Sequence, residues 1–68
     1  MIKDVTLKGD CLTVVRDSGY VMGLNLPGMM SAPYRLEYWD SEKIVIISNE
    51  QYKYTLDEQG HFIGSETL

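Results

Sequence analysis

The chain contains little cysteine and no long apolar run. Its 68 residues include one cysteine, Cys11, so no disulfide can form within the chain, and a small protein without this cross-link suits a reducing compartment. Residues 1–5 lack the apolar stretch of a signal peptide, and no segment approaches the roughly 20 apolar residues that span a bilayer. These absences predict a soluble, cytoplasmic protein that makes no membrane contact.

Basic residues are also few. Six Lys and Arg residues stand against ten Asp and Glu residues, which gives a net charge of −4. Proteins that bind nucleic acid usually concentrate basic side chains in one patch, whereas an acidic chain is repelled by phosphates. The basic residues here are scattered, although folding could still gather Lys3, Lys8 and Lys43. We expect no nucleic-acid partner, and the acidic balance suits a protein partner with a basic surface.

Helical periodicity is absent as well, apart from one candidate turn at residues 29–32. Apolar residues recur with a period of two instead, which is the pattern of half-buried strands. Residues 44–47 form a continuous aliphatic run, which is typical of a strand buried on both faces. The expected strands lie near 2–8, 12–15, 20–26, 34–39, 44–47, 52–56 and 62–63, with turns at 9–10, 17–19, 40–42, 49–50 and 57–60.

These features predict one all-β domain over residues 1–68. The expected fold is a small antiparallel meander of six to seven short strands, as a curled sheet or small barrel, with halves 1–28 and 33–64 joined by a loop at 27–33. A chain this short buries only about 60% of its unfolded surface, so its core must be dense or shared with a partner. The expected core comprises Leu12, Val14, Leu24, Leu36, Ile44, Ile46, Tyr52, Tyr54 and Leu56.

The two halves repeat one pattern at a spacing of 32 residues. Segment 10–20 aligns without a gap with segment 42–52, and each has an aliphatic strand, a polar turn and a tyrosine that opens the next strand. The identical pairs are Tyr20 with Tyr52, Leu24 with Leu56, and Gly28 with Gly60. The pattern predicts two similar hairpin units, which convergent strand patterning explains more simply than duplication.

Residues 44–64 resemble part of a β-propeller blade. The shared pattern is a strand, a turn, a second strand and an Asp-x-x-Gly turn, here residues 57–60. A propeller needs about four to eight blades of four strands each, and this chain has strands for fewer than two. The resemblance therefore implies a propeller only through assembly of several copies, and it assigns no functional residue.

Few side chains could perform catalysis or hold a metal. His61 is the single histidine, and no paired spacing joins it to Cys11 as in a metal site. Cys11 and His61 could form a nucleophilic pair with Asp57 or Glu58 orienting the imidazole, although a semi-buried cysteine and a turn histidine are the simpler interpretation. We expect no catalytic residue, metal or cofactor. The alternative is a small enzyme or ligand-binding protein that uses Cys11 and His61.

The segment between the halves is the least ordinary part of the sequence. Prolines at 27 and 33 flank it, and Met29 and Met30 stand side by side within it. Adjacent methionines are common on adaptable binding surfaces, but they could equally cap the end of a small barrel. Trp39 alternates with Tyr34 along the next strand, so the pattern places it on the face of Arg35 and Glu37.

The sequence therefore predicts a small acidic, non-catalytic protein-binding module. It could act as an adaptor, as an inhibitor or as a self-assembling accessory protein, and the open ends of a meander favour a homodimer. The candidate contact residues are Met29, Met30, Tyr34 and Trp39. Aromatic residues are enriched among the side chains that dominate interface energetics.

Overall fold

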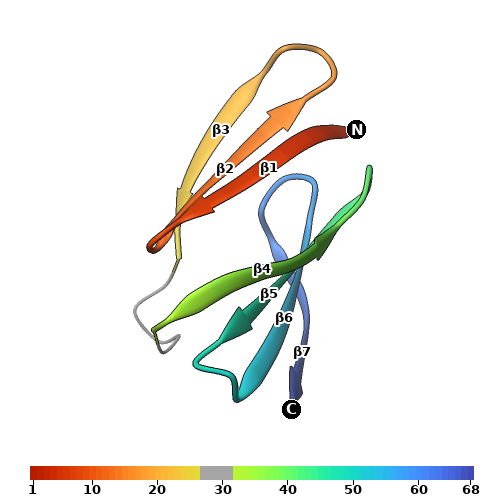
Figure 1. The fold of residues 1–68 in the computed structure, drawn as a ribbon. Coiled ribbons are helices and arrows are strands. Elements are labelled where there is room, and N and C mark those ends of the chain that lie inside the picture. Colours follow the sequence, from red (N-terminus) through yellow and green to blue (C-terminus); the bar gives the residue numbers. More distant parts are fainter. Residues whose placement is uncertain (27–31) are drawn as a thin grey trace.

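The computed structural model describes residues 1–26 and 32–68, and these residues form seven antiparallel strands in two sheets without a helix (Figure 1). The three-stranded sheet has the order β1 (Ile2–Lys8), β2 (Cys11–Arg16) and β3 (Val21–Asn25). The four-stranded sheet has the order β4 (Tyr34–Trp39), β5 (Lys43–Ser48), β6 (Tyr52–Asp57) and β7 (Phe62–Thr67). The prediction of an all-β antiparallel fold is confirmed.

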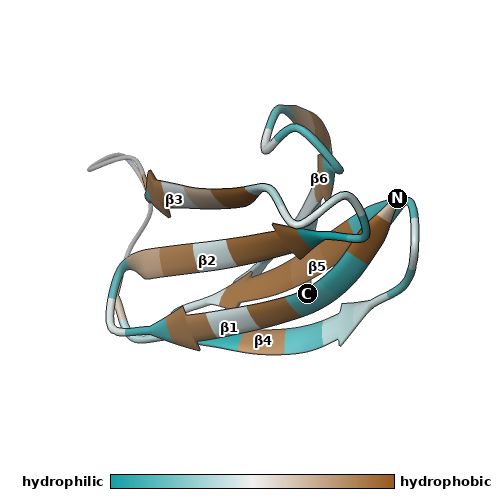
Figure 2. Cartoon of the chain, turned by 90° about the horizontal axis from the view of Figure 1, so that it is seen from above, coloured by the Kyte–Doolittle hydropathy of each residue, from teal (hydrophilic) through white to brown (hydrophobic). Residues whose placement is uncertain are grey.

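The strands do not form one curled sheet or a closed barrel, so that expectation was wrong. The sheets approach each other at one side, where the edge strands β1 and β4 are neighbours (Figures 1 and 2). A backbone hydrogen bond from the N–H of Ile2 on β1 to the carbonyl oxygen of Ser41, in the turn after β4, joins the two parts of the fold at 2.9 Å. Within residues 1–26 and 32–68, β3 and β7 each pair with one neighbouring strand only, so no strand joins the two sheets on that side.

The core lies between the two sheets. Ile46 at the centre of β5 is completely buried, as are Leu12 and Val14 on β2. The buried cluster consists of Ile2, Val5, Leu12, Val14, Leu26, Ile44, Ile46 and Leu56. Each sheet is too small to cover its own apolar face, so the shared cluster holds the sheets together.

β5 is buried on both faces, as the aliphatic run predicted. The four aliphatic residues of β5 are all buried, namely Ile44, Val45, Ile46 and Ile47. Of these four, only Ile44 and Ile46 belong to the cluster between the sheets. Val45 and Ile47 therefore lie on the far face of the four-stranded sheet. The turn that follows has φ of +53° at both Asn49 and Glu50, as a type I′ hairpin requires, so the expected hairpin tip is confirmed.

Several expected core residues are less buried than predicted. Leu24, Leu36 and Tyr54 are only partly buried against the cluster, and Tyr52 is 40% exposed. Tyr52 lies at the start of β6, and it is not among the side chains that pack against the cluster between the sheets. Buried residues that were not expected in the core are Ile2, Val5 and Leu26, whereas Val45 and Ile47 are buried as the aliphatic run predicted.

Candidate functional site

Two of the four predicted contact residues lie on β4, and the other two, Met29 and Met30, fall outside the described residues. Tyr34 begins β4 and Trp39 ends it, so the strand separates them by its full length. Both side chains are partly buried and pack against the core cluster. The structure therefore does not bring Tyr34 and Trp39 together, and their role in protein contact stays a prediction.

Trp39 lies on the opposite face of β4 from the one expected. The pairing of β4 with β5 shifts register between Leu36 and Tyr38, as at a β-bulge. Beyond the bulge the alternation is reversed, so Trp39 turns toward the core and Tyr38 is 49% exposed. The tryptophan is thus a core residue at the margin of the fold, which strict alternation could not predict.

Tyr34 also borders an open hollow of about 470 Å³. Gly9 and Asp10 of the β1–β2 turn form one side of it, and Ala32 and Pro33 lie on the side of Tyr34. The hollow therefore lies between the two sheets, at the end of the fold where β4 begins.

The structure gives Cys11 and His61 different neighbours. Cys11 is exposed at the start of β2, where it pairs with Lys8 and Asn25. The His61 side chain is 73% exposed, and its Nδ1 lies 3.7 Å from a carboxylate oxygen of Asp57. Across residues 1–26 and 32–68, no group of three or more His, Cys, Asp or Glu side chains is placed to hold a metal ion.

A group of aromatic side chains on β6 and β7 was not predicted from the sequence. The ring centroids of Tyr52 and Tyr54 are 6.3 Å apart, and those of Tyr54 and Phe62 are 5.8 Å apart in an edge-to-face arrangement. Phe62 is 42% exposed and the neighbouring Ile63 is 61% exposed. We call Tyr52, Tyr54, Phe62 and Ile63 the aromatic edge.

The aromatic edge also borders a shallow depression. A hollow of about 240 Å³ is lined by Tyr52, Tyr54, Ser65, Glu66 and Thr67. Every residue of β7 is exposed, although the strand is paired with β6 along its length. The signal for this site was present in the sequence at Phe62 and Ile63, but only the structure shows that the rings of Tyr52, Tyr54 and Phe62 lie close together.

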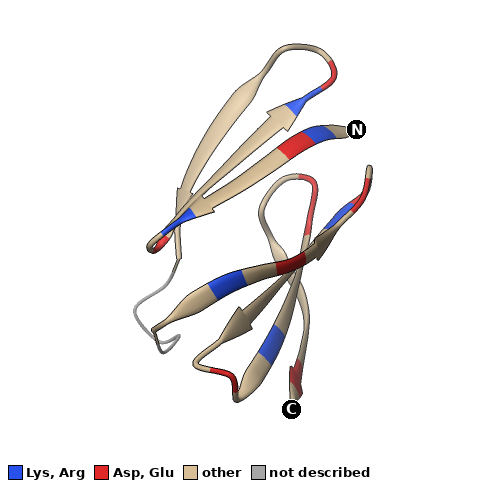
Figure 3. Cartoon of the chain, viewed as in Figure 1, with Lys and Arg blue, Asp and Glu red and all other residues tan. Residues whose placement is uncertain are grey.

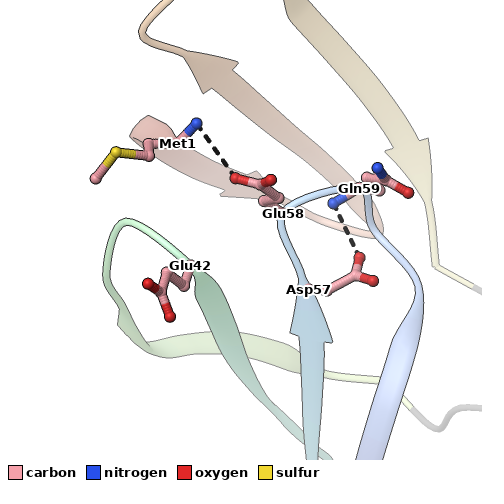
Figure 4. A pocket seen from close by; sticks show the side chains of 5 residues that line it. All are labelled: Met1, Glu42, Asp57, Glu58 and Gln59. Carbon is pink, nitrogen blue, oxygen red and sulfur yellow. Dashed lines mark hydrogen bonds and ion pairs between the residues drawn. The ribbon is translucent and has the colours of Figure 1, made fainter.

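A third hollow, of about 450 Å³, is lined by three residues with carboxylate side chains (Figure 4). Glu42 lies on the β4–β5 turn, whereas Asp57 ends β6 and Glu58 lies in the turn after it. Figure 4 shows the Asp57 carboxylate pointing toward the backbone N–H of Gln59 rather than toward Glu42. The Met1 amino group lies 3.2 Å from a carboxylate oxygen of Glu58, and this contact raises the pKa of the amino group. The remaining lining residue is Gln59.

Asp57 organises the turn beside this hollow. One of its carboxylate oxygens accepts hydrogen bonds from the backbone N–H groups of His61 and Gln59, both at 2.9 Å. These bonds, with that of His61 first, lower the pKa of Asp57 from its ordinary value. Arg16 Nη2 donates to the Glu58 carbonyl oxygen at 2.9 Å, which ties the turn to β2.

Charge is divided unequally between the two sheets (Figure 3). Residues 1–26 contain three basic and three acidic side chains, whereas residues 32–68 contain three basic and seven acidic ones. The whole net charge of −4 therefore falls on the part of the chain that forms the four-stranded sheet. The aromatic edge lies on this acidic sheet.

Comparison of the chain with protein-family models, curated proteins and solved structures finds no match. None of the described residues belongs to a helix that is long and apolar enough to cross a membrane.

Proposed function

We propose that the protein is a small, non-catalytic protein-binding module whose partner presents a basic surface. The observation that carries the proposal is the aromatic edge, because it places exposed rings on the sheet that holds all of the net charge. Aromatic side chains supply much of the energy at protein interfaces, and complementary charge accelerates the encounter. The acidic hollow of Glu42, Asp57 and Glu58 lies on the same sheet and suits lysine or arginine side chains.

The proposal includes Tyr34 as a second contact point. It also includes a cytoplasmic location. Tyr34 borders the hollow at the start of β4, next to the segment that carries Met29 and Met30. The single exposed thiol of Cys11 is compatible with a reducing compartment.

The alternative of a small enzyme or ligand-binding protein predicts an activated Cys11. Because Cys11 is exposed, alkylation of its thiol is expected for a binding module and for an enzyme alike. The alkylation rate per thiolate and the pH dependence of that rate distinguish the two functions. A binding module should react at the rate of a cysteine in an unfolded peptide. Markedly faster reaction near pH 6 would favour the alternative.

We also propose that hairpins β2–β3 and β5–β6 are equivalent units. Cys11 pairs with Asn25 and Lys43 pairs with Asp57, so both ladders have the same register at an offset of 32 residues. The turn bonds from Gly19 N–H to the Arg16 carbonyl and from Gln51 N–H to the Ser48 carbonyl share this offset, at 2.9 and 3.0 Å. The proposal accounts for the repeated sequence pattern by a shared strand register, although the two turns differ: φ is positive at Asn49 and Glu50 in one and at Gly19 in the other.

Affinity capture from a native lysate tests the proposed function. The double substitution Phe62→Ser and Ile63→Ser removes apolar area from the aromatic edge, and Tyr20→Ser is the control because Tyr20 is 58% exposed in the neutral part of the chain and lies outside β3. We expect a partner whose recovery falls with added salt and whose affinity falls at least about fivefold in the double variant, but not in the control. Melting curves of each variant ensure that only folded protein is compared.

The proposed function would be wrong if the captured proteins were the same for the wild type and both variants at every salt concentration. Ile63→Ser alone provides a check on folding, because this side chain is mostly exposed and its loss should barely change stability.

A further inference from the structure

β3 is an open edge of the three-stranded sheet. It pairs with β2 on one side, and no strand within residues 1–26 and 32–68 pairs with its other side. Val21, Gly23 and Asn25 alternate along it as exposed residues, while Met22 and Leu24 turn toward the core.

The hydrogen bonds at its two ends show which backbone groups of β3 point outward. Arg16 N–H donates to the Tyr20 carbonyl oxygen, and Leu26 N–H donates to the Asp10 carbonyl oxygen, both at 2.8 Å. In an antiparallel ladder, hydrogen-bonded and non-hydrogen-bonded pairs alternate. The residues of β3 bonded to β2 are therefore Met22 and Leu24, and the N–H and C=O groups of Val21, Gly23 and Asn25 face away from it.

This edge lacks the features that usually prevent strand pairing. Free edges are commonly protected by charged side chains, proline or bulges. β3 has the sequence Val-Met-Gly-Leu-Asn and pairs with β2 in continuous register. β7, the other open edge, carries Glu66 and a register shift opposite Thr55 and Leu56.

We propose that two copies of the protein pair through β3, antiparallel, about a two-fold axis at Gly23. In this register Gly23 lies opposite Gly23 of the partner subunit, and Val21 lies opposite Asn25 of the partner subunit. All three outward-facing residues of each strand then exchange backbone hydrogen bonds. The result is a continuous six-stranded sheet formed by β1, β2 and β3 of both copies. The dimer is separate from the partner contact at the aromatic edge.

Charge favours a second copy at this edge over the other open edge. Copies of a chain with net charge −4 repel each other least where the charge balances, and residues 1–26 contain equal numbers of acidic and basic side chains. β3 itself has no charged side chain, and Figure 2 shows its mainly hydrophobic character.

The surroundings of Gly23 also leave room for a second strand at the two-fold axis. A Cβ atom placed on Gly23 would meet nothing within 4 Å, so the outer face of β3 is uncovered at this position in a single copy. On the inner face, Met22 and Leu24 are only partly buried in one copy. They would lie beside Met22 and Leu24 of the partner subunit, which extends both cores across the new pair.

Sedimentation equilibrium on two charge variants tests the dimer and its register together. Val21→Lys with Asn25→Lys places like charges opposite each other twice across the axis, whereas Val21→Lys with Asn25→Glu places opposite charges there. All substituted side chains are exposed on one face of β3, so both variants should fold as the wild type does, and melting curves at low concentration check this.

We expect the wild type to reach the dimer mass with rising concentration and the Lys/Glu variant to remain close to it. The Lys/Lys variant should have a dissociation constant about tenfold higher or more than that of the Lys/Glu variant. Equal dissociation constants in the two variants would overturn the register at β3. A wild type that stays at 7.8 kDa up to several hundred micromolar would overturn self-pairing altogether, and neither result would affect lysate capture by the aromatic edge.

Discussion

At the scale of single residues, Gly60 has a conformation and an environment that no other residue type fits easily. It is buried with φ of +84°, in the turn that lies against the inner face of β3. An added Cβ would lie 3.2 Å from both Leu24 Cδ2 and Met22 Cε. The glycine therefore allows both the reversal of the chain and the close contact between the two sheets.

Gly60→Ala should destabilise the protein by about 1–2 kcal/mol from the positive φ, with a further cost from the crowded side chains. Gly19→Ala is the matched control, because Gly19 has φ of +91° but open space around it. Urea unfolding measures both. If the two substitutions cost the same, the turn does not pack against Met22 and Leu24 as described.

Residue faces were predictable only where a strand keeps regular alternation. Tyr34 and Leu36 point toward the core as the period of two indicated, but the bulge after Leu36 moves Trp39 to that same side. A bulge depends on how two strands pair, and one strand's sequence does not reveal it. Tyr52 was assigned to the core for a different reason. Alternation indicates which face of a sheet a side chain lies on, but it does not show whether another layer covers that face.

At the scale of elements, the strongest patterns gave the most accurate strands. The alternating segments predicted strands at 2–8 and 34–39, which match β1 and β4, and the aliphatic run predicted the doubly buried β5. β7 was expected only at 62–63 but runs from Phe62 to Thr67. Residues 64–67 are small or polar and show no apolar alternation, so pairing with β6, rather than local pattern, extends the strand.

The central position of β5 gives a direct stability prediction. Ile46→Val removes one methylene from a completely buried side chain and should cost about 0.5–1.5 kcal/mol, whereas Ile46→Ala should cost about 2–5 kcal/mol. A domain of this size holds only about 3–5 kcal/mol, so the alanine variant should be largely unfolded. Ile63→Val makes the same chemical change at a side chain that is 61% exposed and should cost less than about 0.5 kcal/mol. Similar losses for Ile46→Val and Ile63→Val in thermal unfolding would contradict the core assignment.

At the scale of the whole molecule, the sequence shows that acidic residues are concentrated in the second half of the chain, but it does not show which surface they form. Seven of the ten acidic residues follow residue 31, which is visible without a structure. Only the fold shows that this boundary separates two sheets and that the exposed rings of β6 and β7 lie on the acidic one. The expected barrel was wrong because closure depends on pairing between distant strands, and periodicity within each strand does not determine that pairing.

We propose that the acidic four-stranded sheet binds a partner through its aromatic edge and that the neutral sheet does not. Backbone hydrogen exchange on the complex with the captured partner tests this most directly, at a protein concentration that keeps the oligomeric state constant. We expect slower exchange in residues 52–67 on binding and unchanged exchange in residues 2–25. Protection confined to residues 2–25, with 52–67 unchanged, would contradict this proposal.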